Sequence, residues 1–377
     1  MTDPQSPQLR LTPLAAVHER LGAKMTGFAG WLMPLRYLSE TAEHQAVRTA
    51  AGMFDLSHMG EIVITGPDAA AALDYALVGQ PSALAPGRAR YTMICAPDGG
   101  IIDDLIVYRL AADEFLVVAN ASNTPAVFAE LAGRATGWNA DVTDRTAGYA
   151  LIAVQGPRAA RILKPLTSAD LSEVRYYASY PATVAGYDVL LARTGYTGED
   201  GFELFTRPGD AEPVWNALSA AGAADGLLPA GLAARDTLRL EAAMPLYGNE
   251  LGRDVTPYDA GLGRVVKLDK PADFVGRGAL SRRAQAAPER VLVGLVGRSR
   301  RIPRHGYMVL HDGSPCGTVT SGAPSPTLGK PIAMAYVKPD AASAAEPDGG
   351  AGGLAFDIRG SAEPADLVQL PFYRRPA

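Results

Sequence analysis

An internal repeat constrains the fold of this chain more than any other feature of its sequence. Residues 61–77 (EIVITGPDAAAALDYAL) and 150–166 (ALIAVQGPRAARILKPL) each join a strand-like run, a Gly-Pro pair and an Ala- and Leu-rich run. Glycine permits a sharp turn after a strand, and proline fits the first position of a helix because its missing N–H has no partner there. The repeat predicts two related strand–helix units in an α+β arrangement; a chance similarity of two Gly-Pro turns is the alternative.

The pattern of the chain changes after Glu289. Helical periodicity fades, and short strand-like runs rich in Gly and Pro follow, among them VLVGLVG at 291–297 and PIAMAYVKP at 331–339. Such runs are typical of a small β-barrel or sandwich. Because 377 residues exceed one ordinary core, we expect two or three domains, with a boundary near residues 281–290.

Composition excludes several classes of protein. The chain is 47% hydrophobic and 20% charged with a net charge of −5, which is ordinary for a globular protein and disfavours nucleic acid as a partner. No apolar stretch approaches the ~20 residues that span a bilayer, and the start MTDPQSPQLRLTP has no apolar signal core. The two cysteines and five histidines lack metal-binding spacing. We therefore expect a cytoplasmic protein that binds neither a metal nor a membrane.

Two adjacent carboxylates, Asp103 and Asp104, stand at the head of an apolar run in GGIIDDLIVYRL, residues 99–110. Side chains alternate along a strand, so Asp104 shares a face with Ile106 and Tyr108 and Asp103 takes the other face. Apolar residues on both faces predict a strand covered on both sides, where a carboxylate needs a specific partner. A solvated turn after the glycines is the alternative.

A third carboxylate and a guanidinium complete the candidate site. Glu203 lies between apolar residues in ARTGYTGEDGFELF, residues 192–205, and the alternative for it is an edge-strand side chain that points to water. In the expected helix from Pro229 to Ala243, Asp236 can pair with Arg239 and leave Arg235 free for a ligand; a structural salt-bridge network is the alternative.

A buried carboxylate beside a free guanidinium suits a planar heterocycle with an amide-like edge, such as the pterin of folate. The carboxylate can accept two parallel N–H bonds, and the guanidinium can donate to the neighbouring carbonyl. No GxGxxG after a strand, Walker loop or GxSxG elbow is present, so the sequence does not support a dinucleotide, nucleotide-triphosphate or flavin enzyme.

Several motifs in order resemble the aminomethyltransferase, or T-protein, family of the glycine cleavage system. They include AVRTAAGMFDLSHMGEI, GGIIDDLIVY, ALIAVQGP, RTGYTGEDGFEL, PAGLAARDTLRLEAAMPLYG, TSGAPSPTLGK and the terminal PFYRR. The resemblance implies a three-lobed cloverleaf: two related α+β subdomains and a C-terminal β-barrel domain around a central folate channel. It divides the chain into residues 1–56 with 141–284 (folate-binding), 57–140 (second subdomain) and 285–377 (barrel).

The resemblance also assigns roles to residues. Asp104 looks like the catalytic carboxylate, with Asp103 structural, and Glu203 and Arg235 look like the pair that binds the pterin edge. Terminal Tyr373 and Arg374 resemble the segment near the entrance for the lipoyl carrier. Five further positions match residues that line the folate site: Met59, Tyr91, Val118, Asn120 and Tyr176.

The implied reaction moves the methylene carbon of an aminomethyl group from the lipoyl arm of the H-protein to tetrahydrofolate, a co-substrate, with release of ammonia and no metal or flavin. Two positions depart from the family: Gly27 replaces a frequent acid, and Arg264 replaces a frequent tryptophan. The alternatives are a stand-alone folate-dependent demethylase and a non-enzymatic folate-binding relative. The latter carries a cysteine near residues 273–280, where this chain has none.

Overall fold

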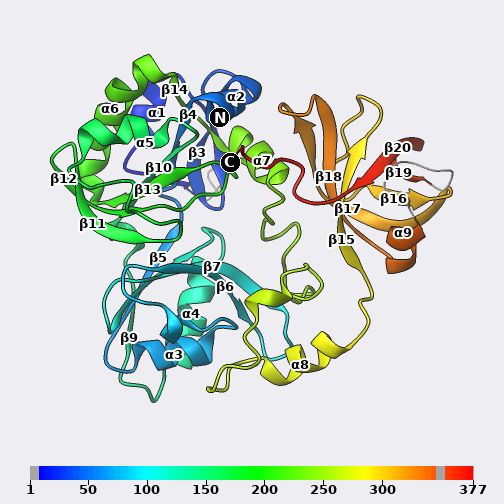
Figure 1. Cartoon of the computed structure of the whole chain (residues 1–377), viewed down its shortest axis with the longest axis horizontal. Helices are drawn as coiled ribbons and strands as arrows, with labels where there is room; N and C mark the ends of the chain where they lie inside the picture. Colours follow the sequence, from blue (N-terminus) through cyan, green and yellow to red (C-terminus); the bar gives the residue numbers. More distant parts are fainter. Residues whose placement is uncertain (1–7, 345–352, 377) are drawn as a thin grey trace.

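The computed structural model describes residues 8–344 and 353–376, which form three lobes (Figure 1). Two lobes are built on large β-sheets, and the third is a closed barrel. The first lobe contains the N-terminal residues and the chain from β10 to α7, the second lobe lies between them in sequence, and the barrel follows. The predicted α+β fold with a C-terminal barrel is confirmed.

A six-stranded sheet forms the centre of the first lobe. Its order is β11 (Ser179–Val184), β12 (Tyr187–Ala192), β13 (Gly201–Thr206), β10 (Ala150–Gln155), β4 (Ala51–Asp55) and β14 (Leu227–Pro229). Beside it lies a three-stranded sheet of β1 (Arg10–Leu11), β3 (Trp31–Arg36) and β2 (Lys24–Phe28). The helices of this lobe are α1 (Ala15–Arg20), α2 (Glu40–Thr49), α5 (Ala159–Leu163), α6 (Ala211–Gly222) and α7 (Leu232–Glu241).

The second lobe repeats the plan of the first. Its five-stranded sheet has the order β6 (Ala89–Cys95), β7 (Ile101–Arg109), β8 (Glu114–Ala119), β5 (Gly60–Thr65) and β9 (Asp141–Asp144), with helices α3 (Ala69–Ala76) and α4 (Thr124–Arg134). The order β6-β7-β8-β5 matches β11-β12-β13-β10, and the helices follow equivalent strands. The predicted repeat is therefore confirmed, and chance similarity is ruled out. The first lobe adds β4 between β10 and β14.

The Gly-Pro turns of the repeat have a steric cause. Gly66 and Gly156 adopt φ values of +123° and +135°, and a Cβ on them would lie 2.5 and 2.6 Å from the carbonyl oxygens of Asn139 and Ala50. Only glycine fits this conformation and this close approach of backbone. Each turn thus leads the chain from its strand into a helix that covers one face of the sheet.

The two large sheets pack face to face. Apolar side chains from both fill the space between them; we call this set the inner cluster, and it includes Leu116, Val118, Leu151, Ala153 and Phe205. Helices cover the outer faces, where α3 and α4 pack on the five-stranded sheet and α5 and α6 on the six-stranded one. A strand such as β7 is therefore covered on both sides.

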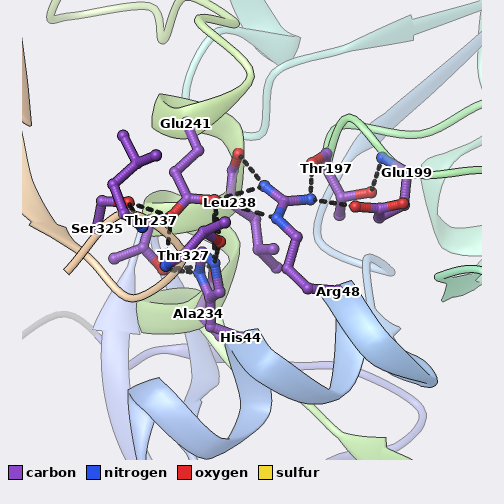
Figure 2. A network of polar contacts seen from close by, with 11 residues as sticks. His44, Arg48, Thr197, Glu199, Ala234, Thr237, Leu238, Glu241, Ser325 and Thr327 are labelled. Atoms are coloured by element: carbon purple, nitrogen blue, oxygen red, sulfur yellow. Dashed lines mark hydrogen bonds and ion pairs between the residues drawn. The ribbon is translucent and has the colours of Figure 1, made fainter. Parts of the chain in front are cut away.

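The barrel closes in the order β15 (Val291–Gly297), β18 (Lys330–Val337), β17 (Ser314–Ser325), β16 (Met308–His311), β19 (Leu354–Ile358) and β20 (Ser361–Val368), with α9 (Pro339–Ala344) after β18. It joins the first lobe through Glu241 of α7, which accepts hydrogen bonds from His44 and from Ser325 and Thr327 of the barrel (Figure 2). Burial opposes ionisation here, but these hydrogen bonds lower the pKa of Glu241 to about 2.

The segment between α7 and α8 (Arg277–Gln285) runs along the second lobe (Figure 1). Its Lys270 is 2% exposed and donates to the carbonyl oxygens of Asp74, Leu77 and Gly79 at the end of α3. The carbonyls of Asp74 and Leu77 belong to the last turn and cap of α3, where the negative end of the helix dipole lies, so the ammonium group caps the helix. The linker is thereby fixed to the second lobe before the chain enters the barrel.

The proposed division into domains stays a prediction. Strand pairing bears on one of its boundaries, the point where the chain returns from the second lobe to the first. Because β9 pairs with β5, residues Asp141–Asp144 belong to the sheet of the second lobe rather than to the first lobe. We therefore propose that the chain returns to the first lobe after Asp144.

Candidate functional site

The adjacent carboxylates of β7 point to opposite faces, as predicted. Leu105 and Val107, on the face of Asp103, pack in the outer core under α3 and α4, whereas Ile106 and Tyr108, on the face of Asp104, belong to the inner cluster. Asp103 is fully buried and Asp104 is partly exposed. Both carboxylates therefore lie inside the layered structure, and the alternative of a solvated turn is wrong.

Asp103 holds the connection from β8 to α4. Its carboxylate accepts the backbone N–H of Asn120 at 2.9 Å, the side-chain amide of Asn120 at 2.8 Å and that of Asn123 at 2.7 Å. Burial, and then the charge of Asp104, raise its pKa, while the three N–H donors oppose the shift. Asp103 thus has all its partners within the protein.

Asp104 has two partners that were themselves predicted site residues. Its Oδ2 accepts a hydrogen bond from the Tyr91 hydroxyl at 3.0 Å, and its Oδ1 accepts one from the Asn120 amide at 2.8 Å. Burial raises the pKa of Asp104, and these two donors oppose the rise. Tyr91 on β6 and Asn120 after β8 come from the strands on either side of β7, so the sheet itself positions the carboxylate.

Glu203 is also held inside the protein. It lies on β13, an inner strand of its sheet, and is 8% exposed, so the alternative of an edge-strand side chain pointing to water is wrong. The hydroxyl of Thr194 donates to its Oε2, as does that of Tyr108 at 3.3 Å. Burial raises the pKa of Glu203, while the Thr194 bond and the charge of Arg235 favour the ionised form.

Arg235 on α7 is the free guanidinium that the sequence predicted. Arg239 pairs with Asp236 at 2.7 Å and with Glu250 at 3.0 Å. The guanidinium of Arg235, by contrast, has no hydrogen bond or ion pair within the described part of the chain. Its guanidinium instead lies over the ring of Tyr196, 4.7 Å from the centroid. Burial lowers the pKa of Arg235, and the charge of Glu203 acts against that shift. A partly buried guanidinium without a partner suits an acceptor on a ligand.

Tyrosines connect these groups into one region. Burial raises the pKa of Tyr177, and after it the charges of neighbouring Tyr176, Glu203 and Asp104 add to the effect. Tyr176 packs edge-to-face on Tyr177, with centroids 4.8 Å apart, and is 48% exposed. Met59 and Val118 contribute to the inner cluster, against which Tyr177 also packs. Of the residues predicted to line a folate site, Met59 and Val118 thus belong to the inner cluster, Tyr176 packs on Tyr177 beside it, and Tyr91 and Asn120 contact Asp104.

Tyr373 and Arg374 have no contact with Asp104, Glu203 or Arg235 among the hydrogen bonds, ion pairs and ring contacts of the described residues. Tyr373 packs under the guanidinium of Arg48, and Arg374 is exposed. Of the two departures from the family, Gly27 is on β2, and Arg264 is exposed in a short turn that packs against β6, the strand of Tyr91. A Cβ at Gly27 would lie 3.2 Å from the flexible Leu9 side chain.

Sequence reasoning missed several supporting residues. Thr194 and Tyr196 lie in the segment that was singled out for Glu203, but nothing in the pattern marked them as partners of Glu203 and Arg235. His58 was also missed. It is 3% exposed, and its Nδ1 has no hydrogen-bond partner among residues 8–344 and 353–376. Burial, followed by the charge of Arg235, lowers its pKa to about 4. The imidazole of His58 is therefore neutral near pH 7.

Within residues 8–344 and 353–376, no group of three or more His, Cys, Asp or Glu side chains could hold a metal ion. Within the same ranges, every helix is too short or too polar to cross a bilayer.

Comparison with known families settles the relationship of the chain. Residues 14–270 match the GCVT N-terminal domain, and residues 290–374 match the glycine cleavage T-protein C-terminal barrel domain. The chain belongs to the glycine cleavage T-protein family. Together the two matches cover both large sheets and the barrel, so the family assignment applies to the whole architecture and not to one lobe.

Close relatives agree with the family assignment over their full length. The aminomethyltransferase of Saccharopolyspora erythraea is 63% identical over 369 residues, which are 98% of this chain and 99% of the relative. That of Streptomyces coelicolor is 61% identical over 373 residues, with coverage of 98% and 99%. The crystal structure of the glycine cleavage system aminomethyltransferase T from Bartonella henselae superposes with a TM-score of 0.89 at 37% identity, covering 97% of this chain and 99% of that one.

Proposed function

We propose that this chain is the aminomethyltransferase of a glycine cleavage system, with tetrahydrofolate as co-substrate and the lipoylated H-protein as donor. The methylene carbon leaves the dihydrolipoyl sulfur and its amino group and joins N5 and N10 of tetrahydrofolate. The two hydrogens of those folate nitrogens appear in the released ammonia and the free thiol, so the reaction balances without a redox step. Full-length membership of the T-protein family is the observation that carries this proposal.

Glu203 and Arg235 are proposed to bind the pterin edge. The ionised carboxylate can accept the 2-amino and N3–H hydrogens, and the guanidinium can donate to the adjacent carbonyl oxygen. Two features support this role. Thr194 and Tyr108 fix the orientation of Glu203, and Arg235 has no competing partner in the described chain.

Asp104 is proposed to be the catalytic carboxylate. Tyr91 and Asn120 fix its orientation, and its partial exposure on the inner face leaves it accessible to a ligand held by Glu203 and Arg235. There it would orient the reacting folate nitrogens and stabilise the positive charge that develops as the new C–N bond forms. Positioning is the larger contribution, because alignment of two reactants can lower a barrier by roughly 7 kcal/mol. Met59, Val118 and Tyr176 are proposed to pack against the folate.

The deciding experiment supplies aminomethyl-loaded H-protein and tetrahydrofolate and measures ammonia and methylenetetrahydrofolate. We expect stoichiometric formation of both products, with neither formed when one substrate is omitted. Folate binding without turnover would point to a folate-dependent demethylase with another donor, or to a binding protein. No folate binding would overturn the proposal. Contact of Tyr373 and Arg374 with the carrier, and the location in the cytoplasm, stay predictions.

A further inference from the structure

The C-terminal segment returns from the barrel to the first lobe (Figure 1). The backbone N–H of Tyr373 donates to the carbonyl oxygen of Glu241 at 2.8 Å, and the guanidinium of Arg48 lies 4.0 Å from the centroid of the Tyr373 ring. Phe372 packs with Leu240, and Arg375 lies 3.7 Å from Asp200. Several independent contacts therefore fix this segment, although it lies at the end of the chain.

Arg48 links the segment to the loop of residues 194–199. Figure 2 shows its guanidinium between two carboxylates: Nη1 donates to Glu199 at 2.9 Å and to the carbonyl oxygen of Thr197 at 2.8 Å, and Nη2 donates to Glu241 at 2.9 Å. The side chain of Arg48 is only 6% exposed. Charge-assisted bonds on several sides hold a planar guanidinium in one orientation. The loop is therefore attached to α2 and α7 through one side chain.

The same loop holds both members of the proposed pterin-binding pair. Thr197 donates to the Gln155 amide oxygen at 2.9 Å, and Gln155 donates in turn to the carbonyl oxygen of Thr194 at 3.0 Å. The Thr194 hydroxyl binds Glu203, and the ring of Tyr196 lies under Arg235. A displacement of the loop would therefore move two partners of the site at once.

We propose that the C-terminal segment Phe372–Arg375 positions the folate site from outside it, with Arg48 as the positioning residue that transmits its docking to Thr194 and Tyr196. The inference rests on the proposed function for the identity of the ligand. The contacts that join Tyr373, Arg48 and the loop of residues 194–199 do not depend on it. In this proposal neither Arg48 nor Tyr373 touches the pterin. Their effect is to keep Glu203 and Arg235 in a binding-ready arrangement before folate arrives, which reduces the ordering that binding must impose.

The first test measures the link in the ligand-free chain. Amide hydrogen exchange across residues 194–199 is compared for wild type, Arg48→Gln, Arg48→Lys and Tyr373→Ala. Arg161→Gln is the matched control, because Arg161 is an exposed arginine that pairs with Asp225 at 3.1 Å. We expect faster exchange of this loop in Arg48→Gln and Tyr373→Ala, a partial effect in Arg48→Lys, and none in the control. Unchanged exchange in Tyr373→Ala would overturn the inference, whatever the chain binds.

The second test measures tetrahydrofolate binding by titration calorimetry and turnover at saturating carrier. We expect Arg48→Gln to raise the Kd and the KM for folate about tenfold, the size of a typical coupling between neighbouring sites, with kcat at saturating folate within twofold of wild type. If Arg48 had only a structural role, the substitution would instead lower the apparent kcat in proportion to the loss of folded protein. Equal folate affinity in all variants would refute the positioning role, whereas absence of binding by wild type would refute the proposed function.

Should Arg48→Gln fail to fold, Tyr373→Ala and a chain ending at Pro371 carry the same test, because they change only the terminal segment. Tyr373→Phe keeps the ring under Arg48 and should retain most of the affinity. A truncated chain with wild-type folate affinity and wild-type loop exchange would contradict the proposal.

Discussion

Asp104→Asn is the substitution that tests the site most directly. The amide has almost the shape of the carboxylate, its oxygen can still accept from Asn120, and its nitrogen can donate to the Tyr91 hydroxyl oxygen. The fold should therefore tolerate the change, and its main effect is the loss of a negative charge on the inner face of β7.

The expected cost follows from the distance over which that charge acts. A carboxylate about 4 Å from a developing positive charge contributes about 4 kcal/mol at an effective dielectric constant of about 20. Since 1.36 kcal/mol corresponds to a factor of ten in rate, the upper bound is a loss of about 10³. Removal of a single preorganised polar group in other enzymes costs about 10²–10³, so we expect kcat to fall within this range.

The assay is single-turnover formation of methylenetetrahydrofolate from loaded carrier, combined with a folate titration. The Kd for folate should rise less than tenfold, because Glu203 and Arg235 are unchanged. The control is Asp103→Asn, whose amide oxygen can still accept from the Asn120 and Asn123 side chains while its N–H₂ faces the backbone N–H of Asn120. This one unfavourable contact should lower the free energy of unfolding by about 2 kcal/mol. A loss of kcat below tenfold in Asp104→Asn would refute the catalytic assignment.

Three further predictions concern Arg235, Asp104 and Lys270. Arg235→Lys should weaken folate binding about tenfold or more in calorimetry, because an ammonium group cannot reproduce the stacked, planar donor; unchanged affinity would contradict the pairing. Burial raises the pKa of Asp104, and the reaction requires its ionised form. We therefore expect kcat/KM to fall with decreasing pH, with a midpoint above the usual aspartate pKa of about 4. Asp104→Asn should lose this acidic limb of the pH profile. Lys270→Met should lower the free energy of unfolding in urea by about 3 kcal/mol, because three buried carbonyl oxygens lose their donor. A loss below about 1 kcal/mol would contradict this role of Lys270.

Local patterns predicted much of the fold and the positions of the main site residues. The repeated Gly-Pro turn predicted two equivalent units because its backbone conformation is a local property of the glycine. Alternation along residues 101–109 separated Asp103 from Asp104 because side-chain direction in a strand depends only on neighbouring residues. The spacing of Asp236 and Arg239 likewise predicted that Arg235 has no partner on its helix.

Contacts between distant segments could not be predicted in this way. Nothing near Glu203 indicates that Tyr108, from the other large sheet, donates to it. The packing of Tyr373 under Arg48 joins opposite ends of the chain and depends on how the barrel docks. Such pairs are determined by three-dimensional packing, which leaves no periodic signal in a single sequence.

The placement of β4 has a consequence for synthesis of the chain on the ribosome. β4 ends at Asp55, yet its sheet partners are β10, which begins at Ala150, and β14, which ends at Pro229. All strands of the second lobe lie within residues 60–144, so that lobe can fold while β4 still waits for its neighbours. At about 5–20 residues per second, this apolar strand waits roughly 5–20 s for β10 and roughly 9–35 s for β14. During that interval its unpaired backbone groups can pair with other chains, so the strand needs protection from aggregation.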